Sequence, residues 1–288
     1  MPPRTAPTAR QQRLGTELRR MREDAGLSIQ EAADRLGINR THITNLELAR
    51  FGVSEERVRT LAAIYACPDG AYVDALAAMT HERRGGWWEE YRGLIATSGL
   101  DLAEMEHHAS RLRVVGLIHI PGLLQTEEYA QAVMGHAVPP WSPPELRRRL
   151  SHRMRRRDIL DRDDPPPCTF IVHEAALHTR FGGTRVLRTQ LERLLEASER
   201  ENITVRVIPL ATEGFPVAGA TVTYASGPVP QLDTVQFDSA LGSMFLDAES
   251  QLRKYRGVLD RTEVVALPVE ESRELVRTIA QRMSPSRP

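Results

Sequence analysis

The sequence of 288 residues lacks most of the features that mark secreted and membrane-bound proteins. Its two cysteines, Cys67 and Cys168, lie far apart and without the spacing of a metal site, so we expect reduced thiols and no disulfide framework. No run approaches the roughly 18 consecutive apolar residues of a membrane span. The opening stretch, MPPRTAPTAR, also lacks the apolar segment of a signal peptide. These absences predict a soluble, cytoplasmic protein with no membrane partner.

Neither sign of charge dominates, because 38 Lys and Arg residues balance 38 Asp and Glu residues. Residues 1–60 hold eleven Arg against eight acidic residues, a mild excess that is smaller than in strongly basic DNA-binding domains. Every basic residue except Lys254 is an arginine, and arginine makes forked contacts to phosphate and guanine where it reaches them. The abundance of Arg, Ala and Pro indicates a GC-rich genome.

The sequence also lacks a recognisable catalytic or metal-binding motif. In HEAALH the histidines His173 and His178 lie five residues apart, whereas the zinc-binding H-E-x-x-H helix needs a spacing of four. His107 and His108 are adjacent, so we expect their side chains to point to different faces. No Gly-rich phosphate loop follows a predicted strand, and no G-x-S-x-G is present. We therefore expect no enzymatic activity, no bound metal and no cofactor.

Two helical patterns follow each other closely in residues 28–50, which read SIQEAADRLGINRTHITNLELAR. Ser28 and Glu31 form an S-x-x-E capping box that starts the first helix. Gly37 ends that helix at a position that favours a left-handed backbone, and Asn39 caps the second helix. The turn is only about three residues long, so the two helices must cross steeply, as in a helix-turn-helix unit.

The second helix of this unit has an inward apolar face and an outward polar face. Ile43 and Leu46 are the apolar positions. The expected outward side chains are Arg40, Thr41, Thr44 and Asn45. Short polar and forked side chains suit base edges and phosphates, and the positive end of the helix dipole leads. The alternative is a hairpin that binds another protein, on which Glu/Lys pairs would be more usual.

Residues 14–66 resemble the helix-turn-helix domains of phage-repressor-like regulators, the Cro/C1-like or XRE family. The resemblance implies base contacts from Arg40, Thr41 and Asn45. It also implies a structural ion pair between Arg22 and Glu47. The full set that we expect at double-stranded DNA is Ser28, Gln30, Asn39, Arg40, Thr41, Thr44, Asn45 and Arg50.

The chain departs from this family at two places. Ile29 stands where the family commonly has a phosphate-contacting Gln. Leu48-Ala49 replaces the usual Asn-Gly at the end of the recognition helix. Because Ala in a left-handed cap costs about 1 kcal/mol, the helix has the option of running on and presenting Arg50 differently.

Composition divides the chain into a disordered arm (1–11), a helix-turn-helix domain of five short helices (12–80), a mainly helical part (81–162) and an α/β domain (163–285). The last part predicts strands at 168–174, 203–210, 220–225 and 233–238, and helices at 187–201, 249–266 and 271–283. The stretch LRVVGLIHI (112–120) fits either a strand or a buried helix. A strand–helix–strand order indicates a sheet with a right-handed crossover.

An Arg-rich helix is predicted at 145–161 and permits three interpretations. It could extend the DNA contact, meet an acidic partner, or form a solvated face that pairs with nearby aspartates, and we favour the last. Those aspartates are Asp158, Asp161, Asp163 and Asp164. A set of aromatic residues could form a ligand pocket or ordinary core, and we favour core. The set is Trp87, Trp88, Tyr91 and Trp141.

The larger part of the chain carries a second resemblance. GWWEEY (86–91), IPGLLQTEEYA (120–130) and HEAALHTRFGG (173–183), with QLERLLEAS (190–198) and ITVRVIP (203–209), look like the C-terminal domain of an actinobacterial regulator family. Its members include WhiJ-like developmental regulators and Scr-type antitoxin-like regulators. The resemblance implies a small partner protein encoded nearby.

We therefore predict a multidomain protein with an all-α helix-turn-helix domain and a mixed α/β C-terminal domain. Its predicted function is sequence-specific transcriptional regulation of development or secondary metabolism. We expect a homodimer on DNA, regulated through the C-terminal domain by a small partner protein or a small-molecule effector. The alternative is an antitoxin-like module that neutralises a neighbouring small protein, with DNA binding secondary.

Overall fold

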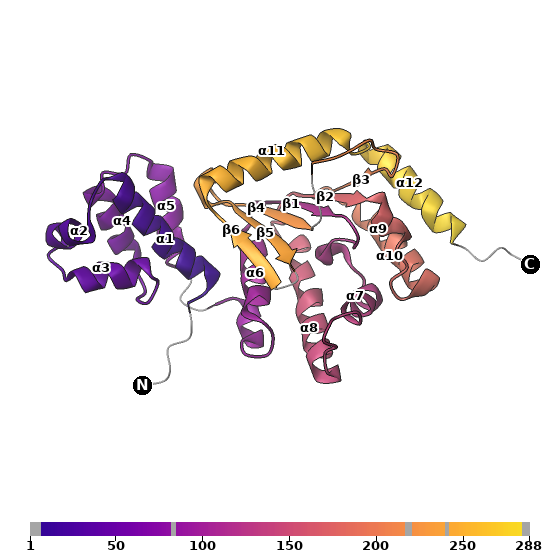
Figure 1. The fold of residues 1–288 in the computed structure, drawn as a ribbon, viewed down its shortest axis with the longest axis horizontal. Coiled ribbons are helices and arrows are strands. Elements are labelled where there is room, and N and C mark those ends of the chain that lie inside the picture. Colours follow the sequence, from indigo (N-terminus) through magenta and orange to yellow (C-terminus); the bar gives the residue numbers. More distant parts are fainter. Residues whose placement is uncertain (1–6, 82–84, 217–220, 240–241, 284–288) are drawn as a thin grey trace, which may run out of the picture. The chain divides into compact units, whose positions relative to one another are not determined.

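The computed structural model describes residues 7–81, 85–216, 221–239 and 242–283. The chain forms two compact units, Met1–Glu89 and Glu90–Pro288. The first unit is helical, and the second is built on a sheet covered by helices (Figure 1). The five-helix N-terminal domain and the mixed α/β C-terminal domain predicted from the sequence are both confirmed.

The five helices of the N-terminal unit each begin at a residue whose side-chain oxygen accepts a hydrogen bond from a backbone amide of the first turn. These capping residues are Thr8, Ser28, Asn39, Ser54 and Asp69. Such caps satisfy amide groups that have no partner within the helix. The helices are α1 (Ala9–Asp24), α2 (Ile29–Leu36), α3 (Arg40–Glu47), α4 (Glu55–Ile64) and α5 (Gly70–Ala78).

The predicted disordered arm is too long at its C-terminal side. Thr8 and Gln11 form a capping box, and α1 begins at Ala9, so the last residues of the predicted arm 1–11 are helical. The Pro- and Thr-rich composition of this stretch predicts disorder, whereas the T-x-x-Q spacing of the capping box predicts the start of a helix. Residues 1–6 lie outside the described residues.

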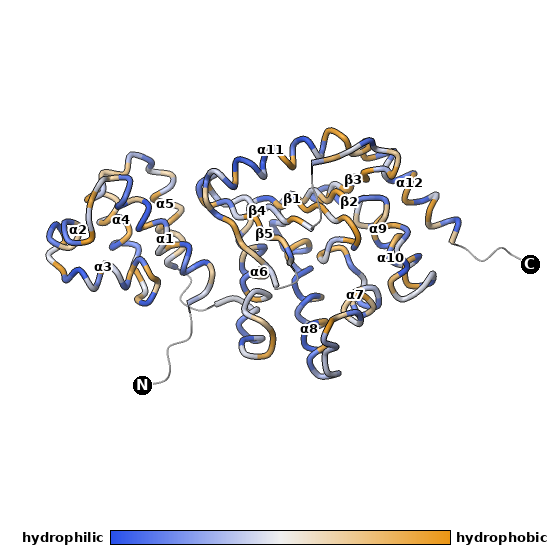
Figure 2. The backbone as a smooth tube through the Cα atoms, viewed as in Figure 1, coloured by the Kyte–Doolittle hydropathy of each residue, from blue (hydrophilic) through white to orange (hydrophobic). Residues whose placement is uncertain are grey.

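Apolar residues at helical spacing form the core of the N-terminal unit (Figure 2). Among the most buried are Leu18, Ile43, Leu61 and Leu76, each at most 1 % exposed. One glycine sets the approach of two helices. A Cβ on Gly15 of α1 would lie 2.5 Å from the backbone oxygen of Glu47 at the end of α3. Any larger residue there would push α1 and α3 apart.

The C-terminal unit contains a six-stranded mixed sheet in the order β3-β2-β1-β4-β5-β6. β1, β2 and β3 are parallel, whereas β4 pairs antiparallel with both β1 and β5, and β5 pairs antiparallel with β6. In the register, Val114 of β1 lies opposite Phe170 on one side and Thr223 on the other. The strands are β1 (Arg111–Gly116), β2 (Cys168–His173), β3 (Ile203–Ile208), β4 (Val222–Ser226), β5 (Thr234–Ser239) and β6 (Gly242–Leu246).

Both faces of the sheet are covered, and the strand residues alternate between the two cores. Phe170 and Val172 of β2 pack with α9, α10 and α12, whereas Ile171 between them packs with α11 on the other face (Figure 1). The helices of this unit are α6 (Thr97–His108), α7 (Glu127–Met134), α8 (Pro143–Arg156), α9 (Glu174–His178), α10 (Gly183–Ala197), α11 (Glu249–Val265) and α12 (Val269–Arg282). Short 3-10 helices are η1 (Trp87–Tyr91), η2 (Gly122–Leu124), η3 (Arg157–Leu160) and η4 (Pro230–Leu232).

The predicted division at residues 162 and 163 does not separate two domains. The ambiguous stretch 112–120 contains β1, which lies between β2 and β4 in the middle of the sheet. Val115 faces one core and Leu112 and Val114 face the other, so the strand contributes to both cores, although its first half also contains Arg111 and Arg113. The α/β domain therefore begins before β1. The sequence analysis also missed β6.

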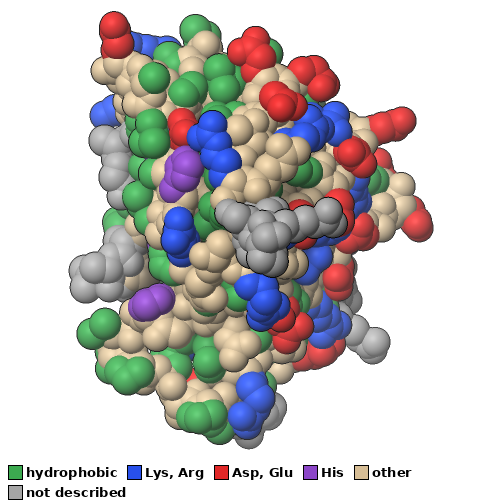
Figure 3. Space-filling view, turned by 90° about the vertical axis from the view of Figure 1, so that its right-hand side faces the viewer, with side chains coloured by type: hydrophobic (Ala, Val, Ile, Leu, Met, Phe, Trp, Pro, Cys, Tyr) green, Lys and Arg blue, Asp and Glu red, His purple; other side chains and the backbone are tan. Residues whose placement is uncertain are grey.

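Charged side chains of opposite sign are interspersed over the end of the C-terminal unit formed by α10 and α12 (Figure 3). Arg273 meets Glu199, and Arg188 and Arg277 pair with Glu192 and Glu274 on their own helices. Neighbouring charges of opposite sign screen one another, so this end carries little field of a single sign. Among the described residues, no helix combines the length and the apolar content needed to cross a lipid bilayer.

Candidate nucleic-acid interface

The first helix of the helix-turn-helix unit starts and ends as the sequence predicts. The backbone amide of Ser28 donates to Glu31 Oε2 at 2.8 Å, and the amide of Glu31 donates to Ser28 Oγ at 3.2 Å. Hydrogen bonds to the Glu31 carboxyl from the Ser28 side chain and then from the Ser28 backbone amide lower the pKa of this carboxyl. Gly37 has φ 64° and ψ 32°, the left-handed conformation that lets the chain leave α2 without strain.

The second helix, α3, is anchored by its apolar face and exposes its polar start. Ile43 and Leu46 are 1 % and 4 % exposed, respectively. At the N-terminus, the amide of Thr41 donates to Asn39 Oδ1 at 2.8 Å. Arg40 and Thr41 are exposed on the first turn, where the helix dipole is positive. This end of α3 therefore offers amide groups, a hydroxyl and a guanidinium to solvent.

The residues predicted to contact DNA lie on the surfaces of α2 and α3 and just after α3. Those that are exposed are Ser28, Gln30, Asn39, Arg40, Thr41 and Arg50. Thr44 and Asn45 are half-buried, and the Thr44 hydroxyl donates to the Arg40 carbonyl at 3.2 Å. The side-chain amide of Gln30 donates to Asp34 on its own helix. α2 and α3 pack directly on each other.

The recognition helix does not run on past its predicted end. α3 ends at Glu47, and Ala49 adopts φ 53°, in the left-handed region. The amides of Ala49 and Arg50 donate to the carbonyls of Leu46 and Asn45 at 3.0 and 2.8 Å. These bonds satisfy carbonyls that the helix leaves open and so stabilise a conformation that Ala does not favour. The option of a longer helix is therefore wrong, and Arg50 is placed by the turn.

A bidentate ion pair joins α1 to the end of α3. Arg22 Nε lies 2.6 Å from Glu47 Oε1, and Arg22 Nη2 lies 3.0 Å from Glu47 Oε2. A third guanidinium nitrogen donates to the carbonyl of Leu27 at 2.7 Å. The two side chains are only 6 % and 7 % exposed. The hydrogen bonds that Arg22 donates to Glu47 raise the pKa of Arg22, and burial together with the Glu47 charge raises the pKa of Tyr65 to about 12.

A second buried polar cluster in the N-terminal unit was missed by the sequence analysis. Glu17 accepts hydrogen bonds from Arg13 Nε at 2.5 Å and from the Tyr72 hydroxyl at 2.6 Å. Burial, followed by the Glu17 charge, raises the pKa of Tyr72. The signal for the helical half was present, because Arg13 and Glu17 have the i, i+4 spacing of a helical ion pair. Together with Arg22 and Glu47, this cluster fixes the helix that supports α3.

In the C-terminal unit, the Arg-rich helix does not pair with the aspartates that follow it. Arg155 pairs with Glu90, and Arg156 pairs with Glu106, whereas Asp161 pairs with Arg200. The expected local pairing needs a helix that continues through the aspartates, and α8 ends at Arg156. The favoured interpretation of a solvated, locally paired face is therefore wrong for Arg155 and Arg156, whereas Arg147 and Arg148 are exposed to solvent.

The aromatic residues do not form one cluster. Trp88 is 1 % exposed and meets Trp87 edge to face, in agreement with a role in packing. Tyr91 packs against His152 and its hydroxyl lies 2.8 Å from Ser151 Oγ. Trp141 is half-buried, and the guanidinium of Arg149 stacks 4.4 Å from its ring centre. Trp141 also packs against the small core cluster of Ala130, Met134 and Leu150, so it combines a packing role with a charged neighbour.

The histidines of HEAALH have structural contacts. His173 caps α9 by accepting a hydrogen bond from the Ala175 amide, and His178 lies 3.2 Å from Glu174 on the same helix. In the part of the chain that the structure describes, no three His, Cys, Asp or Glu side chains are grouped closely enough to hold a metal ion.

Comparison with known families agrees with the division into two units. Residues 13–76 match the family described as Helix-turn-helix domain, and residues 100–278 match the family described as Domain of unknown function (DUF5753). The second match begins before β1, as the sheet topology requires. No curated protein and no solved structure matches the chain. With more than half of its length in the second match, the chain belongs to the DUF5753 family, and its helix-turn-helix domain makes it a DNA-binding regulator.

Proposed function

We propose that this protein is a sequence-specific transcriptional regulator whose α3 enters the major groove of double-stranded DNA. Arg40 and Asn45 contact base edges, and Ser28 and Arg50 hold phosphates. The observation that carries the proposal is the exposed polar start of α3 on a helix whose apolar face is fully buried. Gln30, Asn39, Thr41 and Thr44 complete the proposed contact surface.

The active form would be a homodimer that reads two half-sites about one helical turn apart. One unit of this size buries too little DNA surface for high specificity, which supports a pair of units. The C-terminal unit would receive the regulatory signal, either from a small partner protein encoded nearby or from a small-molecule effector. The resemblance to WhiJ-like and Scr-type regulators supports a role in actinobacterial development or secondary metabolism.

The decisive experiment begins with selection of bound sequences from a random duplex pool or from genomic fragments, which gives the site and its symmetry. The affinity of the full chain for this site is then compared with that of two variants. Arg40→Ala removes the proposed base contact. Arg19→Ala removes the same charge from α1, where Arg19 is exposed and paired with Glu23, and serves as the matched control.

We expect Arg40→Ala to weaken binding to the selected site by about 1–3 kcal/mol and to relax the preference at one base pair. Arg19→Ala should change the affinity little and leave the preference intact. A loss in Arg40→Ala that is equal for all duplexes would make Arg40 a phosphate contact instead. A protein that binds no duplex, but co-purifies with a small neighbour-encoded protein, would favour the antitoxin-like alternative.

A further inference from the structure

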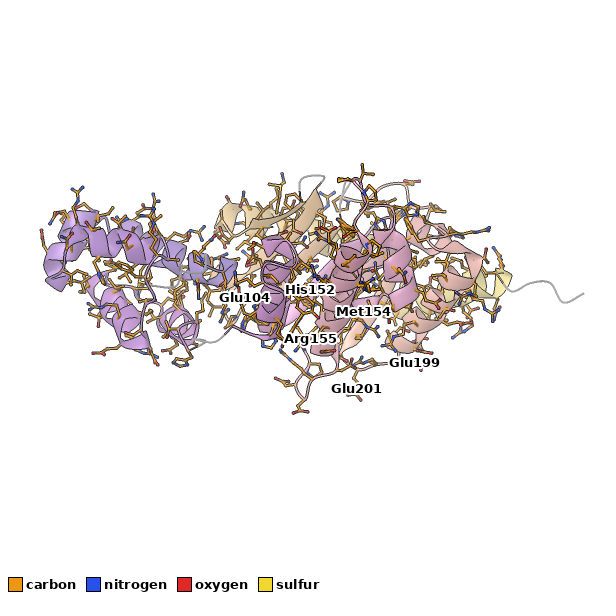
Figure 4. The ribbon with its side chains drawn as sticks, turned by 90° about the horizontal axis from the view of Figure 1, so that it is seen from below. Glu104, His152, Met154, Arg155, Glu199 and Glu201 are labelled. Carbon is orange, nitrogen blue, oxygen red and sulfur yellow. The ribbon has the colours of Figure 1, made fainter. Side chains whose placement is uncertain are left out.

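The C-terminal unit contains a cavity of about 490 Å³ that the proposed DNA contact does not use. It is lined by α6, α8 and η2, and by residues of β1, β2, β4 and β5. Its volume falls in the range of small-molecule sites. Figure 4 shows His152 of α8 on the side of this helix that faces α6. A Cβ on Gly99 of α6 would lie 3.8 Å from Cε1 of the His152 ring.

One face of α8 supplies the charge of this cavity. Arg149, His152, Arg153 and Arg156 occur at helical spacing of three, four and seven residues, and all four line the cavity. Arg148, on the same helix, is exposed to solvent instead. The Arg-rich stretch is thus two-sided, with one set of guanidinium groups directed inward.

Among the described residues, one of the three inward arginines forms an ion pair with a carboxylate. Arg156 and Glu106 form a bidentate pair with distances of 2.7 and 2.6 Å, and their side chains are 10 % and 4 % exposed. Arg153 donates to the neutral Gln125 side chain at 2.9 Å, and among the described residues it forms no ion pair. Burial and the neighbouring Arg156 charge lower the pKa of Arg153 to about 10, so it stays protonated at neutral pH.

Arg149 is also short of partners for its guanidinium. It stacks on Trp141, while its Nε atom is buried and has no hydrogen-bond partner among the described residues. Asp238 is the second acidic residue of the lining, and its carboxylate already accepts hydrogen bonds from Gln236 and Ser243 at 2.8 and 2.7 Å. Within the described residues, two of the three inward arginines therefore form no ion pair, and they feel carboxylate charge only through the longer-range effects of Asp238 and Glu106 on Arg153 and of Glu145 on Arg149.

The cavity lining away from α8 contains several apolar side chains. They include Leu123, Val133, Met134 and Phe170. A buried cation without a counter-charge is costly, and an anion that enters the cavity would offset that cost. An apolar body attached to the anion would gain from burial against these side chains.

We propose that this cavity binds a small organic anion. Its carboxylate or phosphate group contacts Arg149 and Arg153, and its apolar body lies against Leu123 and Phe170. Anion binding by the cavity does not depend on the proposed DNA contact. The role of the anion as the effector of the regulator rests on the proposed function.

The test uses the full chain, isothermal titration calorimetry and three probes of similar size: phenyl phosphate, phenylacetate and neutral phenylacetamide. Arg153→Gln and Arg149→Gln remove one inward cation each, and Arg148→Gln removes an outward cation from the same helix as the matched control. Arg149 stands at a half-buried position, so its variant tests the site even if Arg153→Gln folds poorly.

We expect at least one anion to bind with a dissociation constant below about 10 mM and more tightly than phenylacetamide. Arg153→Gln and Arg149→Gln should raise the dissociation constant for that anion about tenfold or more. Arg148→Gln should leave this constant unchanged. The proposal is overturned if neither anion binds, if the neutral probe binds equally well, or if the inward and outward variants behave alike.

A second arm separates this site from the DNA contact, which also attracts phosphate. Arg40→Ala should abolish or weaken duplex binding and leave the anion affinity unchanged, whereas Arg153→Gln without anion should bind the duplex normally. Loss of anion binding in Arg40→Ala would place the anion at the DNA surface and overturn the cavity site. Failure of duplex binding alone would count against the proposed function and leave the cavity result standing.

Discussion

The two units of the protein treat buried arginine in opposite ways. In the N-terminal unit, Arg22 meets Glu47 through two hydrogen bonds and a backbone carbonyl through a third, so its charge is fully matched. In the C-terminal unit, Arg153 reaches only a neutral amide in the part of the chain that the structure describes. A matched buried charge holds helices together, whereas an unmatched one at a cavity is available to a ligand. The contrast assigns a structural role to the first arginine and a binding role to the second.

The largest effect should come from breaking the matched pair. Arg22→Ala or Glu47→Ala alone should lower the free energy of unfolding by about 3–5 kcal/mol, because the remaining charge is left buried without its partner. Urea unfolding of the full chain, followed by circular dichroism, measures this. Arg19→Ala breaks an exposed pair with Glu23 on the same helix and should cost about 1 kcal/mol or less. Equal effects of Arg22→Ala and Arg19→Ala on the free energy of unfolding would show that the buried pair stabilises the domain no more than the exposed pair does.

The next effect concerns His152, which lies beside the unmatched arginine. Burial, followed by the charges of Arg156 and Arg153, lowers the pKa of His152 to about 3 from about 6.5 in the unfolded chain. As pH falls below 6.5, the unfolded chain takes up the proton first. The stability contribution of neutral His152 is therefore complete above pH 6.5 and is lost as pH falls toward 3.

This linkage should remove about 3 kcal/mol of stability between pH 6.5 and about pH 4.5, since each pKa unit corresponds to about 1.4 kcal/mol. In His152→Gln this part of the decrease in the free energy of unfolding with falling pH should disappear. Urea unfolding at a series of pH values measures the decrease. His178 is exposed, so His178→Gln is the control and should keep the slope of the wild type. A wild-type slope in His152→Gln would show that other groups cause the acid sensitivity.

A smaller effect tests the end of α3, where the structural pair is anchored. Ala49→Gly should raise the free energy of unfolding by about 1 kcal/mol, because Gly adopts the left-handed backbone without the steric cost of a Cβ. DNA affinity should be unchanged, since the turn that places Arg50 is kept. A destabilised Ala49→Gly would mean that the Ala side chain contributes packing that outweighs the backbone strain.

The smallest effect is expected at the unmatched arginine. Arg153→Gln should change the free energy of unfolding by less than about 1 kcal/mol, because the lost hydrogen bond to Gln125 is offset by removal of a poorly matched charge. The same urea experiment as for Arg22→Ala applies. A loss as large as that of Arg22→Ala would make Arg153 a structural residue and weaken the case for an anion site.

The parts of the fold that the sequence predicts are those determined by near neighbours. The capping box of Ser28 and Glu31, the left-handed Gly37 and the cap at Asn39 each depend on residues at most three positions apart, so the helix-turn-helix unit could be located closely. The close approach at Gly15 could not, because its cause is the backbone of Glu47 on another helix.

The C-terminal unit depends more on distant residues. β1 lies between two strands and buries apolar residues on both faces, so the apolar run that follows Arg113 does not distinguish a strand from a buried helix. Which arginines of α8 face inward depends on where the helix ends and on Glu106, fifty residues earlier. A local reading therefore paired these arginines with the wrong carboxylates, and the cavity was not visible from the sequence.

Glu47 has a consequence for regulation. The Glu47 carboxylate accepts hydrogen bonds from Arg22, and the Glu47 backbone oxygen lies close to Gly15. The last residue of α3 therefore meets α1 at two places. A reading helix held in this way loses little freedom on docking, which favours affinity. It also cannot be switched off by local melting without unfolding the domain. On the proposed function, an effector would therefore act on the spacing of the two α3 helices of the proposed dimer rather than on their shape.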